Sequence, residues 1–187
     1  MPAPIEDYAL LSDCRTAALV SRDGSVAWLC VPRFDSGSVF GALLGGADEG
    51  HWRLRPADPA ATATRRYDGD TLTLVTRWET ATGVAEVHDL LVVDPRHLDV
   101  THRVDLVRRV VGISGEVAFT QSLRLRFDYA RAVPWIRQTG TEGTPELTAI
   151  ARPDAVVVRG GALEPTDHVH RGTLAVAAGT TRDLTLT

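Results

Sequence analysis

The stretch Ala17-Ala18-Leu19-Val20-Ser21-Arg22-Asp23-Gly24-Ser25-Val26-Ala27-Trp28-Leu29-Cys30-Val31-Pro32-Arg33-Phe34-Asp35-Ser36 contains two apolar runs joined by Asp23-Gly24. An Asp-Gly pair between β-forming runs predicts a hairpin with a type I′ turn, because both residues can take the positive φ that this turn needs. In the register that follows, Val20 faces Ala27 and Leu19 faces Trp28. Both faces of this ribbon are apolar, so we expect the hairpin to be central and covered on both sides.

A short helix is predicted directly after the hairpin. Ser36 is placed to cap a helix that runs through residues 39–44, and Gly45-Gly46 can supply the positive φ that ends it. No other stretch has the sustained spacing of apolar residues that a helix requires, so the pattern predicts no set of helices large enough for a helical barrel.

The remainder of the chain has a β pattern. Turn signals recur about every ten residues, and residues 116–128 place apolar side chains on one face of a strand, together with Gln121, and polar ones on the other. Further strands are predicted at 51–55, 71–78, 84–93, 101–111, 147–151, 155–159, 169–177 and 182–187, with Gly112 ending the strand at 101–111. The fold class predicted is therefore all-β, an antiparallel β-sandwich with one short helix, and a single domain over residues 1–187.

Composition narrows the class of protein. All 20 basic residues are arginines, and they are interleaved with 24 acidic residues to give a net charge of -4, so no basic stripe is available for nucleic acid. No apolar run reaches the ~18 residues of a membrane span, and the first residues lack the pattern of a signal peptide. We expect a cytoplasmic protein, with no nucleic-acid or membrane partner, in which Cys14 and Cys30 are free thiols.

Several motifs resemble a known family. They are Ile5-Glu6-Asp7-Tyr8, Asp13-Cys14-Arg15-Thr16-Ala17-Ala18-Leu19-Val20, Asp23-Gly24-Ser25, Trp28-Leu29-Cys30, Pro32-Arg33-Phe34-Asp35-Ser36, Arg126-Phe127-Asp128-Tyr129 and Pro134-Trp135. Together they resemble the trehalase-like N-terminal domain of glycoside hydrolase family 15, the domain found in bacterial trehalases and glucoamylases. The chain departs from the family pattern at Ala27, where the family usually has aspartate, and at Ala130, where it usually has glycine.

The resemblance implies a role in a larger enzyme. In the family, this sandwich precedes a helical barrel that hydrolyses terminal α-glucosidic bonds with inversion, in substrates such as trehalose or maltodextrin, and the catalytic glutamates belong to the barrel. Such hydrolysis needs two carboxyl groups roughly 5 to 9.5 Å apart across the bond, and the sequence offers no obvious pair. We therefore assign no catalytic residue and no cofactor, and name the barrel, in cis, as the partner.

The loop after the hairpin is the candidate site. Arg33 and Asp35, with Arg15 nearby, carry groups that can orient sugar hydroxyls or an adjoining domain, with Phe34 as an anchor toward the core. The alternative is an ion pair that only braces the loop. The substrate-facing or barrel-facing candidates are Arg15, Trp28, Arg33, Asp35 and Trp135.

Other functions stay open at this stage. A stand-alone carbohydrate-binding or assembly module would expose Trp52, Trp78 or Trp135 as a stacking platform, although core packing is the simpler expectation for each. The third reading, a catalytic sandwich, lacks a candidate pair of carboxyl groups. His168 and His170 share a face of a predicted strand, but without a third ligand we expect no metal site. If a barrel normally covers one face, the isolated chain is expected to self-associate.

Overall fold

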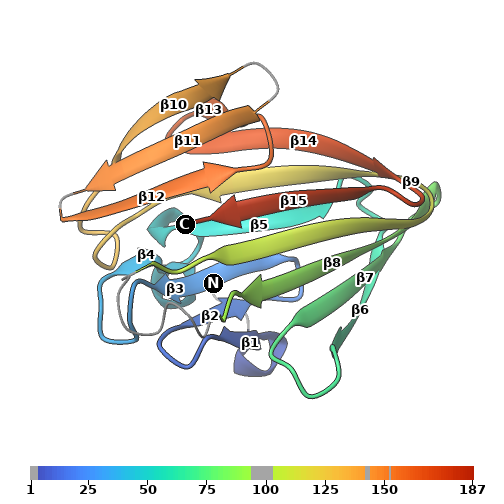
Figure 1. Cartoon of the computed structure of the whole chain (residues 1–187), viewed down its shortest axis with the longest axis horizontal. Helices are drawn as coiled ribbons and strands as arrows, with labels where there is room; N and C mark the ends of the chain where they lie inside the picture. Colours follow the sequence, from blue (N-terminus) through green and yellow to red (C-terminus); the bar gives the residue numbers. More distant parts are fainter. Residues whose placement is uncertain (1–3, 94–102, 142–143, 152) are drawn as a thin grey trace.

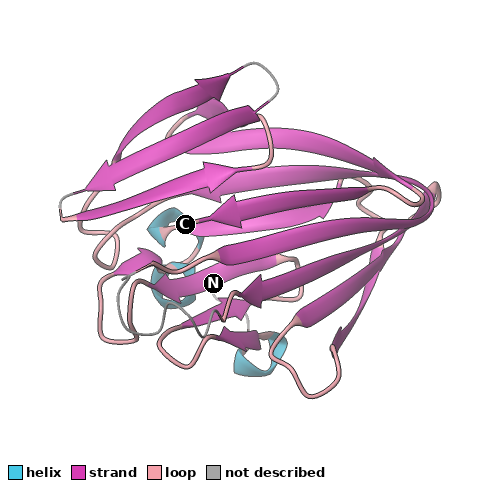
Figure 2. Cartoon of the chain, in the orientation of Figure 1, coloured by secondary structure: helices cyan, strands magenta, loops and turns pink. Residues whose placement is uncertain are grey.

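A computed structural model describes residues 4–93, 103–141, 144–151 and 153–187 of the chain. Its strands are all paired antiparallel and form one continuous 15-stranded sheet that folds into two layers (Figures 1 and 2). The main path of this sheet runs β1-β2-β3-β5-β9-β15-β12-β11-β10, and the other strands branch from it. The predicted all-β sandwich is confirmed, and the described residues contain no helical barrel.

The first layer is built around the hairpin. Its strands are β1 (Ala9–Ser12), β2 (Ala17–Val20), β3 (Ser25–Cys30), β4 (Ser38–Phe40), β5 (His51–Pro56), β13 (Glu164–Thr166) and β14 (Val169–Ala177). The strands of the second layer are β6 (Thr62–Tyr67), β7 (Leu74–Glu79), β8 (Gly83–Leu91), β10 (Trp135–Thr141), β11 (Thr144–Ala151), β12 (Asp154–Arg159) and β15 (Thr181–Leu186).

Strand β9 (Leu106–Arg124) belongs to both layers. Its first half pairs with β8 and β15, and its second half pairs with β5 and β14. The sequence predicted two strands separated at Gly112, whereas the structure has one strand that bends around the right-hand end of Figure 1. Gly115 lies in the bend with φ +58, and a Cβ there would approach the carbonyl oxygen of Thr82 to 2.1 Å, so the bend requires glycine.

The hairpin of β2 and β3 is confirmed, but its turn differs from the prediction. Leu19 faces Trp28 as expected, whereas a bulge makes Val20 face Val26. The N–H of Gly24 donates to the carbonyl of Ser21 (3.0 Å), and within the turn only Gly24 has positive φ (+78). The geometry is that of a three-residue loop ending in a left-handed glycine, because the carboxylate of Asp23 accepts hydrogen bonds within the turn and keeps Asp23 at negative φ.

The hairpin is covered on both sides, as predicted. Adjacent residues of β3, which point to opposite faces, are buried in turn: Val26, Ala27, Leu29 and Cys30. Val26 and Leu29 belong to a hydrophobic core that draws side chains from both layers. Trp52 on β5 and Phe119 on β9 are completely buried within that core.

The predicted helix is much shorter than expected. Residues 38–40 form strand β4, which pairs with β3, and α1 spans only Ala42–Gly45. Ser36 does not cap it; the N-terminal neighbour of α1 is Gly41, with no capping side chain. The stop at Gly46 (φ +101) is as predicted. Single turns of 3₁₀ helix occur at η1 (Ile5–Asp7) and η2 (Ala47–Glu49).

Five strands were missed by the sequence analysis: β1, β4, β6, β10 and β13. Strands β6 and β10 are almost wholly exposed, so they carry little of the apolar alternation that reveals a strand. Where the structure describes helices, none is long and apolar enough to span a membrane.

A buried ion pair joins the two layers. Arg108 on β9 and Asp89 on β8 have 0% and 1% exposed side chains, and Arg108 Nε donates to Asp89 Oδ1 at 2.8 Å. The same guanidinium donates to the carbonyl oxygens of Gly24 and Trp52, each at 2.7 Å. The contact with Asp89 lies within the second layer. The two contacts with carbonyl oxygens reach the hairpin turn and β5 of the first layer. Arg108 therefore fixes the hairpin turn against the opposite layer.

Candidate functional site

The loop between β3 and β4 is a closed turn that projects from one end of the sandwich, opposite the bend in β9 (Figure 1). The backbone N–H of Arg33 donates to Ser36 Oγ (3.2 Å), and the N–H of Ser36 donates to the Arg33 carbonyl (3.1 Å). Ser36 thus closes the loop in place of capping a helix. The arrangement holds the backbone on both sides of Asp35.

Arg33 and Asp35 form an ion pair at the surface. Arg33 Nε lies 2.9 Å from Asp35 Oδ1, and the two side chains are 67% and 75% exposed. The hydrogen bond from Arg33 lowers the pKa of the Asp35 carboxyl below its ordinary value of 3.8. Asp35 is therefore a carboxylate at neutral pH, able to accept hydrogen bonds but not to act as a general acid.

Two of the other predicted residues lie beside this loop. The carbonyl of Arg15 accepts the N–H of Phe34 at 3.0 Å, which ties the approach to β2 to the loop. Trp28, on β3, is half-buried, with its ring centroid 5.9 Å from that of Tyr129. The hydroxyl of Tyr129 in turn donates to the Ser36 carbonyl at 3.2 Å, so Trp28 is connected to the loop through this tyrosine.

Tyr129 sits in a turn that sequence reasoning did not identify as part of the site. Asp128, Tyr129 and Ala130 all have positive φ, at 49°, 55° and 65°. Left-handed backbone costs a residue with a Cβ roughly 1–2 kcal/mol. The resemblance noted in the sequence implies glycine at the position of Ala130, and this difference was the available signal for a left-handed turn here. The turn holds the Tyr129 side chain against the loop.

Cys30 lies under the same tyrosine. Burial raises the pKa of its thiol, and a hydrogen bond with Tyr129 partly offsets that rise. Cys14 is exposed, and both cysteines are free, as predicted.

Phe34 and Trp135 are the remaining residues singled out from the sequence. Phe34 is 58% exposed and is not an anchor in the core; Tyr129, whose ring lies near that of Trp28, contacts the loop from the protein side instead. Trp135 lies apart from the loop, at the start of β10, the last strand on the main path of the sheet. Its indole is 65% exposed, with the Arg137 guanidinium 4.2 Å from the ring centroid.

The other tryptophans and the histidines offer no site of the predicted kinds. Trp52 and Trp78 are buried, so they cannot form a stacking platform. His168 lies at φ +63 in the turn before β14, so it does not share a strand face with His170 as predicted. The residues that the structure describes contain no group of three potential metal ligands; His97 and His102 lie outside them.

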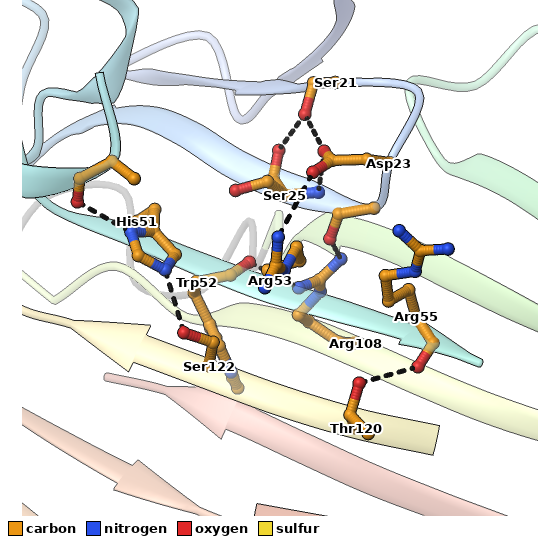
Figure 3. A network of polar contacts seen from close by, with 12 residues as sticks. Ser21, Asp23, Ser25, His51, Trp52, Arg53, Arg55, Arg108, Thr120 and Ser122 are labelled. Atoms are coloured by element: carbon orange, nitrogen blue, oxygen red, sulfur yellow. Dashed lines mark hydrogen bonds and ion pairs between the residues drawn. The ribbon is translucent and has the colours of Figure 1, made fainter. Parts of the chain in front are cut away.

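A polar groove of about 520 Å³ opens elsewhere, on the outer face of the first layer. It is lined by η1, the hairpin turn, η2 and one face of strands β5, β9 and β14, and it includes His51, Arg53, Ser122, Arg124 and Arg171. His51 and Ser122 are buried residues of this lining, and Figure 3 shows the contact between them, with Arg53 and the hairpin turn nearby. No local sequence pattern reveals this groove, because its residues come from strands far apart in the chain.

His51 is held in one orientation. Its Nδ1 lies 2.8 Å from the carbonyl oxygen of Ala47, which can only accept, so Nδ1 carries the proton and donates. Nε2 is then the acceptor for the Ser122 hydroxyl at 3.0 Å. Burial first, and then the positive charges of Arg53 and Arg124, lower the pKa of His51, although the bond to Ala47 opposes this. His51 is therefore neutral at pH 7.

The fold and the loop together define a class of protein, an antiparallel sandwich that presents a structured arginine–aspartate loop at one end. A family model described as "Trehalase-like, N-terminal" matches residues 1–161, and the chain belongs to this family.

Similar segments occur in proteins described as trehalases. The trehalase of Mycolicibacterium smegmatis is 44% identical over an alignment of 166 residues, and the match covers 81% of this chain and 25% of that trehalase. The trehalase of Mycobacterium tuberculosis is 41% identical over 167 residues, 81% of this chain and 24% of that protein. Trehalase 1 of Sulfolobus acidocaldarius is 40% identical over 76 residues, 41% of this chain and 13% of that protein. The chain therefore spans about a quarter of the length of the first two relatives.

Proposed function

We propose that residues 1–187 form the non-catalytic N-terminal domain of a family 15 glycoside hydrolase of trehalase or glucoamylase type. In this proposal a helical-barrel domain in the same polypeptide hydrolyses a terminal α-glucosidic bond, in trehalose or a maltodextrin, and the sandwich supports it. The observation that carries the proposal is the match over 81% of this chain to about a quarter of two trehalases. A cytoplasmic location fits the two free cysteines.

The chemistry of the exposed loop supports a non-catalytic role. Inverting hydrolysis needs one protonated and one ionised carboxyl group on opposite sides of the bond. Asp35 is ionised, and its charge is already satisfied by Arg33. A carboxylate and a guanidinium held together in this way can bind vicinal sugar hydroxyls or a facing loop, but they cannot supply the acid.

The proposal assigns the loop a positioning role. Arg33 and Asp35 would face the substrate pocket or the barrel loops around it, with Arg15 and Trp28 supporting them from the protein side. The support is structural: Ser36 closes the loop and Tyr129 binds its carbonyl, so the exposed pair is presented with restricted freedom. Trp135 lies on another strand and would face the barrel at a separate point.

The test of the non-catalytic role uses the isolated chain. Purified residues 1–187 are incubated with trehalose and with maltose, and glucose release is compared with that of a heat-denatured sample. We expect no difference for either sugar. Glucose release above the denatured control would show that the sandwich itself is catalytic.

An alternative function is a stand-alone carbohydrate-binding or assembly module. Trp135 is the observation that favours it, since its large exposed ring could stack on a sugar once Arg137 moves aside. Quenching of tryptophan fluorescence by maltooligosaccharides in the isolated chain, lost on Trp135→Ala, would support this alternative over the support role.

A further inference from the structure

The polar groove gathers three arginines around one hydroxyl group. Ser122 on β9 is the direct register partner of Arg53 on β5 and of Arg171 on β14. Directly opposed residues of antiparallel strands share a face, as do residues two positions apart on one strand, so Arg124 joins them on that face. All four residues line the groove. The convergence follows from the pairing of three strands.

The charge in this groove is only partly neutralised. Four arginines line it, namely Arg22, Arg53, Arg124 and Arg171, against three aspartates, Asp7, Asp23 and Asp48. Asp7 pairs with Arg22, Asp48 pairs with Arg124, and Asp23 lies 3.9 Å from Arg53. Arg171 is exposed and forms no ion pair within the described part of the chain. The four arginines outnumber the three aspartates, and the neutral His51 adds no charge, so the lining has an excess of positive charge.

Donor capacity is also unfilled at the floor. Arg124 Nε is buried and has no hydrogen-bond partner among the described residues. A buried donor without a partner costs about 1–3 kcal/mol, and arginines on neighbouring strands repel one another. Both costs fall if an anion enters the groove and accepts from these guanidinium groups.

We propose that this groove is a binding site for a tetrahedral oxyanion, either free phosphate or the phosphate of a small phosphomonoester. Guanidinium forks match the paired oxygens of such an anion and bind it bidentately. Arg53 and Arg171 lie on the strands that flank β9, and Arg124 lies on β9 itself, two positions from Ser122. His51 holds the Ser122 hydroxyl at the floor, so the anion meets a fixed polar surface. The proposal does not depend on the role assigned to the Arg33–Asp35 loop.

The test measures anion binding by the full chain. Dissociation constants for inorganic phosphate, glucose 6-phosphate and chloride are determined by calorimetry at constant ionic strength, together with the thermal midpoint. We expect phosphate-type anions to bind in preference to chloride and to raise the midpoint by roughly 2–4 °C at about five times the dissociation constant. The tighter of the two phosphate ligands identifies the source of the anion.

Two charge-matched variants locate the site. Arg171→Gln removes an exposed arginine from the groove, and Arg182→Gln removes one on β15, whose described hydrogen bond is to the backbone of Thr181. We expect Arg171→Gln to weaken phosphate binding about tenfold or more and Arg182→Gln to change it less than twofold. Arg53→Gln serves as a second groove variant. Equal affinity in the groove and control variants, or phosphate binding no tighter than chloride, would overturn the proposal.

Discussion

Two arginine–aspartate pairs in this protein share a geometry and differ in their surroundings. The nitrogen–oxygen distance is 2.8 Å in Arg108–Asp89, where both side chains are buried, and 2.9 Å in Arg33–Asp35, where both are mostly exposed. Arg108 also binds two backbone carbonyls that belong to the opposite layer, whereas among the described residues the hydrogen bonds of Arg33 are to Asp35 and Ser36 of its own loop. The same chemistry therefore connects the two layers at one place and is exposed at the surface at the other.

The largest expected effect is at the buried pair. Asp89→Ala leaves Arg108 as an uncompensated charge in the core, and breaking a buried pair in this way costs about 3–5 kcal/mol. We expect the free energy of unfolding, measured with urea, to fall by that amount. The control is Asp183→Ala, which breaks the exposed Arg109–Asp183 pair (2.7 Å) and should cost at most about 1 kcal/mol. Similar losses in the two variants would contradict the contrast.

The second prediction concerns the exposed pair and uses a chimera, in which this chain replaces the matched segment of the M. smegmatis trehalase. Asp35→Ala should lower kcat/KM for trehalose about tenfold or more while moving the melting temperature little, because the carboxylate is mostly exposed and is proposed to contact substrate or barrel. Asp183→Ala in the same chimera should leave kcat/KM unchanged. A destabilised Asp35→Ala protein with normal specific activity would make the pair a structural brace.

A third prediction addresses the turn that supports the loop. Ala130→Gly removes the Cβ that makes positive φ unfavourable at this position. Glycine has the larger conformational entropy in the unfolded chain, which offsets part of this gain, so the substitution should stabilise the protein by roughly 0.5–1 kcal/mol. Thermal unfolding should shift upward by about 1–4 °C. Ala162→Gly, at an exposed position without positive φ, should give no gain. If both substitutions destabilise the protein, the turn is not strained.

The smallest expected effect is the pH dependence that comes from His51. Burial holds the pKa of His51 below its ordinary value of 6.5, so the unfolded chain takes up this proton more readily than the folded protein. Stability should therefore fall as the pH drops below 6.5. His170, whose pKa is also lowered by burial, adds to the trend. Denaturation at pH 7.5 and 5.5 should show a smaller loss in His51→Gln than in the unsubstituted chain; an unchanged loss would contradict this assignment.

The two pairs also show how far the sequence alone reaches. Asp23-Gly24 predicted the hairpin, and the loop residues Arg33 and Asp35, two positions apart, could be paired by inspection. Arg108 and Asp89 were not paired, although Arg108 shares a face with Leu106 and Val110, and an arginine on an apolar strand face needs a buried partner. Finding that partner requires the register of β8 against β9.

The groove and the long strand were beyond sequence reasoning for a related reason. Gly112 and Gly115 are typical of turns, and only tertiary packing shows that β9 continues through them into the other layer. Ser122, Arg53 and Arg171 meet because three strands pair in one register, and no local pattern encodes pairings over such separations.

The most direct measurement of the central claim is trehalose hydrolysis by three proteins at equal concentration: the isolated chain, the chimera, and the M. smegmatis trehalase without its matched segment. If the sandwich is a non-catalytic support, the chimera releases glucose, and the isolated chain and the shortened trehalase do not. A shortened trehalase as active as the chimera would contradict the support role, and glucose release by the isolated chain would contradict its non-catalytic nature.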